Sequence, residues 1–311
     1  MTLPVAKEGP IDVSIITVNW NVRELVKAMI ESIPAAVGPL RFEVIVVDNA
    51  SKDGSVDMLR AEFPEVTTIA SPDNLGFARG NNLGFERSKG DVVAFVNPDM
   101  VLAPGSILGL VEFLRARPKV GMVGPKIVLP DGFVQSEVKE LPGPRTVLLA
   151  LPGGSRVNAA IGKASGPSDP NEAQRSGYLH GSCFALPRRA YEQIGLMPVL
   201  TFMYGEEVMM GHLLREHGYE VWYFPKVSVT HFDDASANKR WQPREKKVLK
   251  RTAHTVVMRR VLPAPLYFAW NSLMVSREAA RDVMARVQGE DHRLHEDMLK
   301  VHLAAFAERG S

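Results

Sequence analysis

The sequence has little of what several common protein classes require. Its 311 residues include one cysteine, Cys183, which excludes an intrachain disulfide framework and a cysteine-based metal cluster. Cys183 lies in an apolar stretch, which favours a buried structural thiol over a nucleophile. No run reaches the roughly 18 apolar residues of a membrane span. Residues 1–13 lack a charged start followed by an apolar segment, so we expect no signal peptide and a cytoplasmic location.

The chain also lacks a strong charge of either sign and a glycine-rich loop after its first apolar run. The net charge is +2, and the fractions of hydrophobic (45%) and charged (23%) residues are ordinary for a globular protein with a sizeable core. Residues 19–25 (NWNVREL) contain no glycine. Dinucleotide-dependent enzymes and sugar nucleotidyltransferases on a similar sheet need glycines there, so both classes are disfavoured.

The sequence does contain a regular alternation of predicted strands and helices. Apolar, β-branched runs predict strands at 13–18, 42–47, 66–70, 92–96 and 120–124. Helical spacing predicts helices at 22–33, 53–63, 77–88 and 105–117, the first with Asn21 as N-cap and a loop from Pro34 to Pro39. This order predicts an α/β fold with a mostly parallel central sheet and helices on both faces. Gly76, Gly80 and Gly84 would let one helix approach the sheet closely.

Polar side chains follow the predicted central strands. Pro98 cannot donate to a sheet ladder, so the strand at 92–96 ends there and presents Asp99 at its carboxyl end. Asn19 and Asp48 follow two other strands, and right-handed crossovers would place all three at one rim. Asp99 is either a turn residue that bonds its own backbone or a ligand for a hard divalent cation.

The second half of the chain is less regular. Residues 141–171 are rich in proline, glycine and serine and predict a loop. A strand at 177–186 and a helix at 188–194 follow, and a helix from Glu206 to His217 should end at Gly218 as a C′ glycine. Two short strands are predicted at 219–224 and 227–230.

The C-terminal part begins with a basic segment. From Lys239 to Arg260 nine lysines and arginines face only Glu245, and residues 266–275 (LYFAWNSLMV) are apolar with large aromatics. Residues 239–275 could dock on an anionic membrane, or form a solvated helix that packs on the main domain. Nucleic-acid binding is disfavoured, because no stacking or helix-turn-helix pattern accompanies the charge.

At this point the ordered motifs resemble the inverting family 2 glycosyltransferases with a GT-A fold, particularly a rhamnosyltransferase-like subgroup. The matching stretches are VSIITVNWN, EVIVVDNASKDGSVDMLR, NLGFARGNNLG, VAFVNPDM, VGMVGPKI, GSCFALPRRAYEQIG, MYGEEVMMGHLLREHGY and VTHFDDAS. The resemblance implies a glycosyltransferase domain at 1–236, with a nucleotide-binding half at about 12–130 and an acceptor half at about 131–236. Residues 237–311 would form a helical extension.

The resemblance implies two sets of donor-binding residues. The base would be bordered by Thr17, Asn19 and Asp48. Asp48 would accept a ring N–H of uracil or thymine, or alternatively cap the turn that follows it. The nucleotide or diphosphate pocket would be lined by Asn74, Arg79 and Asn82. Arg79 suits a phosphate because its fork donates twice, although a plain surface arginine is the alternative.

The resemblance also implies a metal site and a catalytic base. Asn97-Pro98-Asp99 stands where the family has Asp-x-Asp, so Asn97 would reach the ribose and Asp99 would hold Mg²⁺ or Mn²⁺. His231 is either a further ligand, which suits Mn²⁺ better, or structural. Glu206-Glu207 replaces the family's Glu-Asp pair, with Glu207 as the base; its longer side chain and the nearby Met209 are departures from the pattern. Alternatively, both acids merely favour a helix N-terminus.

The implied function is a metal-dependent inverting glycosyltransferase of cell-surface polysaccharide synthesis. The first expected donor is dTDP-rhamnose and the second a UDP-sugar, with a glycan or lipid-linked acceptor. Such a protein would be cytoplasmic and could lie at the inner face of the cell membrane as a peripheral protein. A nucleotide-sugar-binding module whose chemistry has decayed is the alternative, motivated by Glu207 and Met209.

Overall fold

The computed structural model describes residues 3, 9–135, 138–151, 171–232 and 241–307, which form two compact units. The first unit comprises Met1–Glu140, Pro170–Phe202 and Glu206–Lys239. The second comprises Leu141–Asp169, Met203–Gly205 and Arg240–Ser311. The predicted domain boundary at 236 and 237 remains a prediction.

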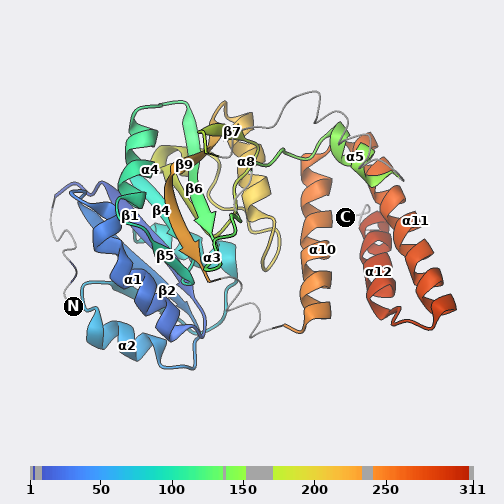
Figure 1. The fold of residues 1–311 in the computed structure, drawn as a ribbon, viewed down its shortest axis with the longest axis horizontal. Helices are drawn as coiled ribbons and strands as arrows, with labels where there is room; N and C mark the ends of the chain where they lie inside the picture. The colour runs from blue at the N-terminus through green and yellow to red at the C-terminus, as the bar shows by residue number, and fades with distance from the viewer. Residues whose placement is uncertain (1–2, 4–8, 136–137, 152–170, 233–240, 308–311) are drawn as a thin grey trace. The chain divides into compact units, whose positions relative to one another are not determined.

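The first unit is built on one sheet, whose N-terminal half is parallel as predicted. Its strands are β1 (Val13–Asn19), β2 (Phe42–Asn49), β3 (Thr67–Ser71) and β4 (Val92–Val96), in the order β3-β2-β1-β4 (Figure 1). Asn19 pairs with Asp48 at the carboxyl ends of β1 and β2. Parallel pairing of β1 with β4 directs residues 97–99 to the same rim, as the strand ends predicted.

The other half of the sheet has mixed strand directions. It contains β5 (Met100–Leu102), β6 (Val120–Val128), β7 (Gln174–Ser176), β8 (Cys183–Pro187) and β9 (Glu220–His231). The order continues β4-β8-β6-β9-β5, with β7 beside β9; only β6 and β9 are parallel among these pairs. The expected predominance of parallel pairing therefore holds for the first half alone. The two strands predicted after residue 218 form the single strand β9, which contains a register shift.

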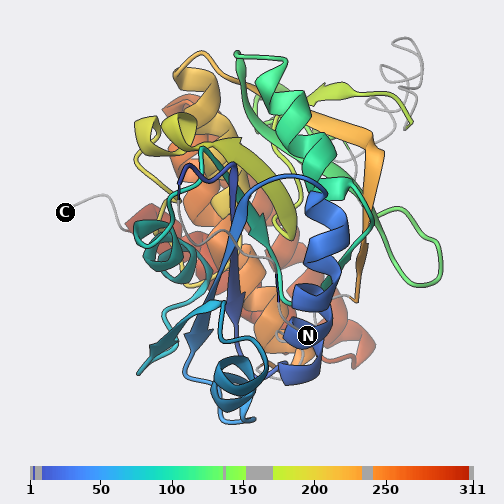
Figure 2. The ribbon, with the colours of Figure 1, turned by 90° about the vertical axis from the view of Figure 1, so that its left-hand side faces the viewer.

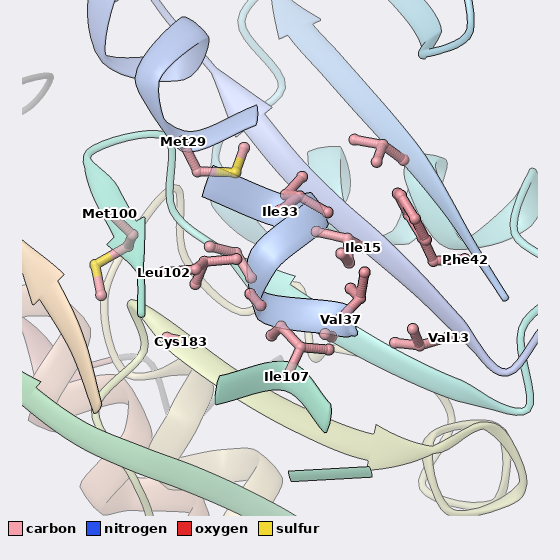
Figure 3. Packing of buried hydrophobic residues seen from close by; sticks show 14 of the residues in the cluster. Val13, Ile15, Met29, Ile33, Val37, Phe42, Met100, Leu102, Ile107 and Cys183 are labelled. Carbon is pink, nitrogen blue, oxygen red and sulfur yellow. The ribbon is translucent and has the colours of Figure 1, made fainter. Parts of the chain in front are cut away.

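Helices cover both faces of this sheet, as predicted. One face is covered by α1 (Arg23–Val37), α2 (Ser55–Glu62) and α4 (Ser106–Arg115), which share a buried apolar cluster with β1 and β2. The other is covered by α3 (Phe77–Glu86), α7 (Arg188–Gln193) and α8 (Glu206–Glu216). Figure 2 shows α1 and α4 along the same side of the strands. Figure 3 shows Met29 and Ile33 of α1 packed with Ile15 of β1, and Cys183 in the same cluster.

Three sequence predictions in this unit can be judged directly. A Cβ atom built on Gly80 or Gly84 would lie 2.9 Å from Val18 or 2.6 Å from Ile16, so the predicted close approach of α3 to the sheet is confirmed. The predicted loop from Pro34 is wrong, because α1 runs on through Pro34 to Val37. Asn21 is not the N-cap; it has a φ of 54°, and its side chain accepts the Lys52 N–H instead.

The second unit is helical. It contains α5 (Pro144–Ala150), within the stretch predicted as a loop, and α10 (Pro243–Val261), α11 (Ala264–Gln288) and α12 (Arg293–Ala307). Its core gathers Met258, Leu262, Tyr267, Trp270 and Met274. Among the described residues, none of the helices is both long and apolar enough to cross a membrane. Residues 152–170, in the predicted loop, and 233–240, at the start of the basic segment, lie outside the described residues.

Two of the aromatic residues in the stretch predicted to dock on a membrane, Tyr267 and Trp270, are buried in that core. Tyr267 and Trp270 are 2% and 3% exposed. They therefore stabilise the helical unit, and membrane contact through residues 239–275 stays a prediction. The reason for their burial is helical periodicity: α11 turns these aromatics inward together with Met274.

Candidate active site at the carboxyl ends of the strands

The first part of the rim is formed by the ends of β1 and β2. Asn19 Nδ2 donates to Asp48 Oδ2 at 2.8 Å and to Ser51 Oγ at 3.3 Å. The Ser51 N–H donates to Asp48 Oδ1 at 2.8 Å, so Asp48 caps the following turn, as the alternative proposed. Each carboxylate oxygen can accept a second hydrogen bond, so the capped Asp48 can still accept one from a base N–H.

Thr17 and Asn19 are fully buried in this structure. Thr17 Oγ1 and Asn19 Oδ1 have no hydrogen-bond partner among the described residues. Buried polar atoms are seldom left unpaired, which makes these two atoms candidates for a ligand or water contact. Their predicted contact with the nucleotide base stays a prediction.

The loop and helix that carry Asn74, Arg79 and Asn82 have a clear structural role. Asn74 Oδ1 accepts the Gly76 N–H at 3.0 Å, forming a local turn. Asn82 donates to the Met197 carbonyl at 2.9 Å, and its Oδ1 accepts from the Tyr191 hydroxyl at 2.6 Å. These bonds fasten α3 to the 191–197 segment.

Arg79, by contrast, is exposed, and its side chain makes no hydrogen bond or ion pair with a described residue. Its guanidinium is therefore available to a phosphate, whereas the Asn82 amide is already engaged within the protein. The diphosphate contacts predicted for these residues stay predictions.

The turn at 97–99 brings Asp99 against His231. The Asn97 N–H donates to the Ser182 carbonyl at 2.8 Å, which ties the turn to the start of β8. Asp99 Oδ1 lies 3.4 Å from His231 Nε2, and the two side chains are only 6% and 5% exposed. Met100 pairs with His231 between β5 and β9, so the sheet itself places the imidazole beside the carboxylate. The Asn97 side chain is half-buried, and its contact with a ribose stays a prediction.

The contacts of His231 define which of its ring nitrogens can bind a cation. Nδ1 lies 2.6 Å from Gln135 Oε1, an acceptor, so Nδ1 carries the proton in the neutral ring. The lone pair of Nε2 then faces Asp99 Oδ1, which has no hydrogen-bond partner among the described residues. Two buried acceptors that face each other need a cation or a proton between them, so Asp99 and His231 fit a divalent ion.

The described residues contain no group of three or more histidine, cysteine or acidic side chains able to hold a metal. Within the described part of the chain, this place therefore offers at most two such ligands. Mg²⁺ and Mn²⁺ accept such a site when substrate phosphates and water complete their shell.

Glu206 and Glu207 begin α8 and have different surroundings. Glu206 is buried, at 5% exposure, whereas Glu207 is half-buried. A Cβ atom built on Gly181 would lie 3.8 Å from Glu207 Oε2, so this carboxylate borders the 178–181 segment. Burial raises the pKa of the Tyr178 phenol, and the nearby negative charge of Glu207 adds to this rise.

The two carboxylates of the predicted site meet the same short segment. Ser182 accepts from the turn that carries Asp99, and Gly181, its neighbour, borders Glu207. His180 directly precedes Gly181, and its ring centroid is 5.8 Å from that of His231. Residues 178–183 therefore connect the predicted metal ligands with the predicted base.

Sequence reasoning missed His180, Gln135 and Ser182. His180 Nδ1 accepts the Ser182 N–H at 3.3 Å and lies 2.9 Å from Ser182 Oγ, which leaves the ring proton on Nε2. The only signal was the histidine in GYLHGSC, just before a predicted strand. The position of His180 near the predicted site depends on the antiparallel pairing of β8 with β4. The alternation of predicted strands and helices did not indicate this pairing.

Comparisons with known proteins identify the family of this chain. The model of glycosyl transferase family 2 matches residues 14–195, more than half of the chain. An N-acetylglucosaminyl-diphospho-decaprenol L-rhamnosyltransferase of Mycobacterium tuberculosis is 31% identical over 209 residues, which cover 60% of this chain and 66% of the relative. A hexosyltransferase of low-salt glycan biosynthesis from Haloferax volcanii is 25% identical over 71% of this chain and 67% of its own length. The matched region thus spans about two thirds of these relatives.

Solved structures show the same fold. A mannosyltransferase from Pyrobaculum calidifontis in complex with GDP-Man and Mn²⁺ aligns with a TM-score of 0.57 at 17% identity, over 98% of this chain and 89% of its own. GalNAc-T7 with UDP, GalNAc and Mn²⁺ aligns with a TM-score of 0.51 at 17% identity, over 71% of this chain and 43% of its own. The predicted α/β, GT-A class of fold is confirmed. The chain belongs to glycosyl transferase family 2.

Proposed function

We propose that this protein is a metal-dependent inverting glycosyltransferase. It transfers a sugar from a nucleotide-diphosphate donor to a hydroxyl group of a glycan or lipid-linked acceptor. The observation that carries the proposal is the convergence of the Asp99–His231 pair and Glu207 on the 178–183 segment. Candidate cation ligands and a partly exposed carboxylate that border the same segment suit transfer from a diphosphate leaving group.

Asp99 and His231 would hold Mg²⁺ or Mn²⁺. When bound, the ion supplies positive charge that stabilises the departing nucleoside diphosphate. The relevant atoms are the unpartnered Asp99 Oδ1 and His231 Nε2, which Gln135 keeps in the metal-binding tautomer. The Mn²⁺ named with both structural neighbours supports this choice of cofactor.

Glu207 would be the catalytic base. An acceptor hydroxyl becomes a good nucleophile only as its proton is removed, so a carboxylate must reach it. Glu207 is half-buried and borders Gly181, whereas Glu206 is buried within the protein. As the acceptor oxygen bonds to the anomeric carbon, its proton passes to Glu207. The bond between that carbon and the diphosphate oxygen breaks, and the diphosphate leaves with the electron pair. Attack from the opposite side inverts the configuration.

The donor that we propose first is dTDP-rhamnose, with UDP-sugars second. The relative from Mycobacterium tuberculosis is named a rhamnosyltransferase acting on a diphospho-decaprenol, which supports rhamnose and a lipid-linked acceptor. Asp48 would recognise the pyrimidine, because its carboxylate at the rim can accept a ring N–H beside its bonds to Asn19 and Ser51. Arg79 would contact the diphosphate.

The deciding experiment is a donor screen with the full chain. dTDP-rhamnose, UDP-sugars and GDP-mannose are incubated with Mn²⁺, Mg²⁺ or EDTA, and release of nucleoside diphosphate is measured. We expect release from one donor, dependent on the metal and accelerated by an acceptor. A protein that binds dTDP or UDP with Mn²⁺ but releases nothing from any donor would instead be a binding module. Met209 was one of the two residues that motivated this alternative. Its side chain is buried, at 7% exposure, so it adds no evidence for a binding module.

A further inference from the structure

A lysine and a tyrosine near the candidate base carry polar groups that form no hydrogen bond with a described residue. The Tyr178 side chain is half-buried, and its hydroxyl makes no such bond. Lys139 Nζ lies 5.9 Å from the centroid of the Tyr178 ring, within the range of a cation–π contact. This ammonium forms no hydrogen bond or ion pair with a described residue. We refer to these two residues as the Lys139–Tyr178 pair.

Backbone contacts hold the Lys139–Tyr178 pair together. The two residues face each other in an isolated antiparallel bridge. The Lys139 N–H donates to Ser176 Oγ at 2.9 Å, and the Gly177 N–H donates to the Lys139 carbonyl at 2.5 Å. Ser176 Oγ also lies 2.6 Å from the Tyr178 carbonyl oxygen. The bridge therefore fixes one register, in which the ammonium and the phenol are presented together.

The Lys139–Tyr178 pair lies near Glu207. A Cβ atom built on Gly211 would lie 3.0 Å from Tyr178 Cβ, and Gly211 follows Glu207 by one turn of α8. Cβ atoms four residues apart on a helix are about 5–6 Å apart. The pKa of the Tyr178 phenol is raised by burial and further by the negative charge of Glu207. A substrate molecule that reaches the Glu207 carboxylate is therefore within reach of the Tyr178 hydroxyl as well.

The order of contacts along the 178–183 segment places the pair on the acceptor side. Ser182 is bonded to the turn that carries Asp99, and Gly181 borders Glu207. Tyr178 lies three residues beyond Gly181, away from that turn. The donor diphosphate is proposed to lie at the metal ligands, at the other end of the segment. The molecule that meets Tyr178 is therefore the one that Glu207 activates, which is the acceptor.

We infer that the Lys139–Tyr178 pair binds the acceptor, and that this acceptor is a sugar linked to a diphosphate. The Tyr178 hydroxyl would donate to an oxygen of the acceptor sugar, and the Lys139 ammonium would pair with the diphosphate. A cation that has no ionic partner at this place favours an anionic acceptor over a neutral glycan, because complementary charge gives specificity. The inference rests on the proposed function and names the chemical class of its acceptor.

The test compares two acceptors with the full chain, using the donor and metal that the donor screen selects. One acceptor is farnesyl-diphospho-N-acetylglucosamine, and the other is the neutral octyl N-acetylglucosaminide. Lys139→Met keeps the side-chain stem over the ring but removes the charge. We expect it to raise the KM of the diphosphate acceptor by about tenfold and to leave the KM of the neutral acceptor unchanged. Tyr178→Phe should raise both KM values by about fivefold, because it removes one neutral hydrogen bond.

Two further variants and a binding measurement serve as controls. Lys139→Arg keeps the charge and should keep the low KM of the diphosphate acceptor. Lys89→Met removes an exposed lysine near the amino end of β4, away from the rim that carries Asp99, and should behave like the wild type. Calorimetry with dTDP and Mn²⁺ should give the same affinity for Lys139→Met and the wild type, because the donor diphosphate binds elsewhere.

The possible failures of the inference and of the proposed function can be told apart. The inference is overturned if the wild type uses both acceptors with equal KM, or if Lys139→Met changes both KM values alike or neither. It is also overturned if Lys139→Met weakens dTDP binding, which would assign the lysine to the donor. A wild type that hydrolyses a donor but transfers to neither acceptor overturns the inference and leaves the proposed donor chemistry standing. A wild type that releases no nucleoside diphosphate from any donor refutes the proposed function, and the inference with it.

Discussion

The position of Glu207 depends on a glycine one turn further along α8. Gly211 lies four residues after Glu207, on the same face of the helix. A Cβ atom built on Gly211 would lie 2.2 Å from the Gly177 carbonyl oxygen and 3.0 Å from Tyr178 Cβ. The absence of a side chain therefore lets α8 press against the 177–178 backbone, and this contact sets Glu207 beside Gly181. We predict that Gly211→Ala impairs catalysis more than folding.

The expected magnitude follows from this geometry. Ordinary van der Waals contact begins near 3.4 Å, so helix and backbone must separate by about 1 Å. Overpacking of this kind lowers the free energy of unfolding by about 1–3 kcal/mol. The higher helix propensity of alanine offsets up to about 1 kcal/mol of this loss. A displacement of about 1 Å in an active site can cost about 10²-fold in rate. We therefore expect Gly211→Ala to lower kcat by about two orders of magnitude and to lose only about 1–2 kcal/mol of stability.

The assay is steady-state release of nucleoside diphosphate by the variant and by a matched control. Gly109→Ala places a Cβ 2.6 Å from the Val227 side chain, a similar clash but on α4 and against a side chain. It should lose comparable stability, measured by urea unfolding, and keep most of the turnover. The donor KM should change little in both variants. Equal turnover of Gly211→Ala and Gly109→Ala would refute the view that the packing of α8 positions the base.

Three further predictions concern single side chains. Asp99→Ala should abolish Mn²⁺-dependent binding of nucleoside diphosphate in calorimetry; unchanged affinity would remove Asp99 from the metal site. Glu207→Gln should keep donor affinity and lower turnover by about two to four orders of magnitude, and near-normal turnover would point to Glu206. Burial lowers the pKa of His302 from 6.5 to about 4. Below pH 6.5 the unfolded chain therefore binds this proton more strongly than the folded chain, and the free energy of unfolding decreases as the pH is lowered. Titration of His302 alone should lower the free energy of unfolding by about 2 kcal/mol between pH 7 and pH 5, so His302→Gln should lose about 2 kcal/mol less than the wild type over this range; an equal loss in both proteins would contradict this reasoning.

The parallel half of the fold could be predicted because local pattern and topology coincide there. The runs that became β1, β2 and β4 are buried on both faces and read as continuous apolar strands. Their crossover helices follow directly in the sequence, so the rim with Asn19 and Asp48 could be foreseen. The end of α8 could be predicted from an equally local signal, the glycine that follows the helix. Gly218 has a φ of 78°, which confirms its role as a C′ glycine.

The mixed half could not be predicted, because its pairings join segments far apart in the chain. β8 pairs antiparallel with β4, about 90 residues earlier, and nothing in either strand specifies this partner. The same holds for β5, which is three residues long and pairs with β9. The loop predicted from Pro34 was wrong for a different reason. Proline usually ends a helix, but burial of Ile33, Ala36 and Val37 in the core stabilises α1 beyond Pro34.

The candidate metal site shows why residue type alone could not identify its second ligand. Asn97-Pro98-Asp99 carries one acid where the family pattern carries two, so the sequence left the second ligand open. The antiparallel pairing of Met100 with His231 supplies an imidazole at that place, and the Gln135 contact turns its Nε2 lone pair toward Asp99. A hydrogen bond from Nδ1 to a second residue is the usual way in which a protein orients a metal-binding histidine. The loss of one acid from the motif is thus compatible with the proposed metal binding, because His231 on the neighbouring strand β9 would provide a ligand that the linear motif does not contain.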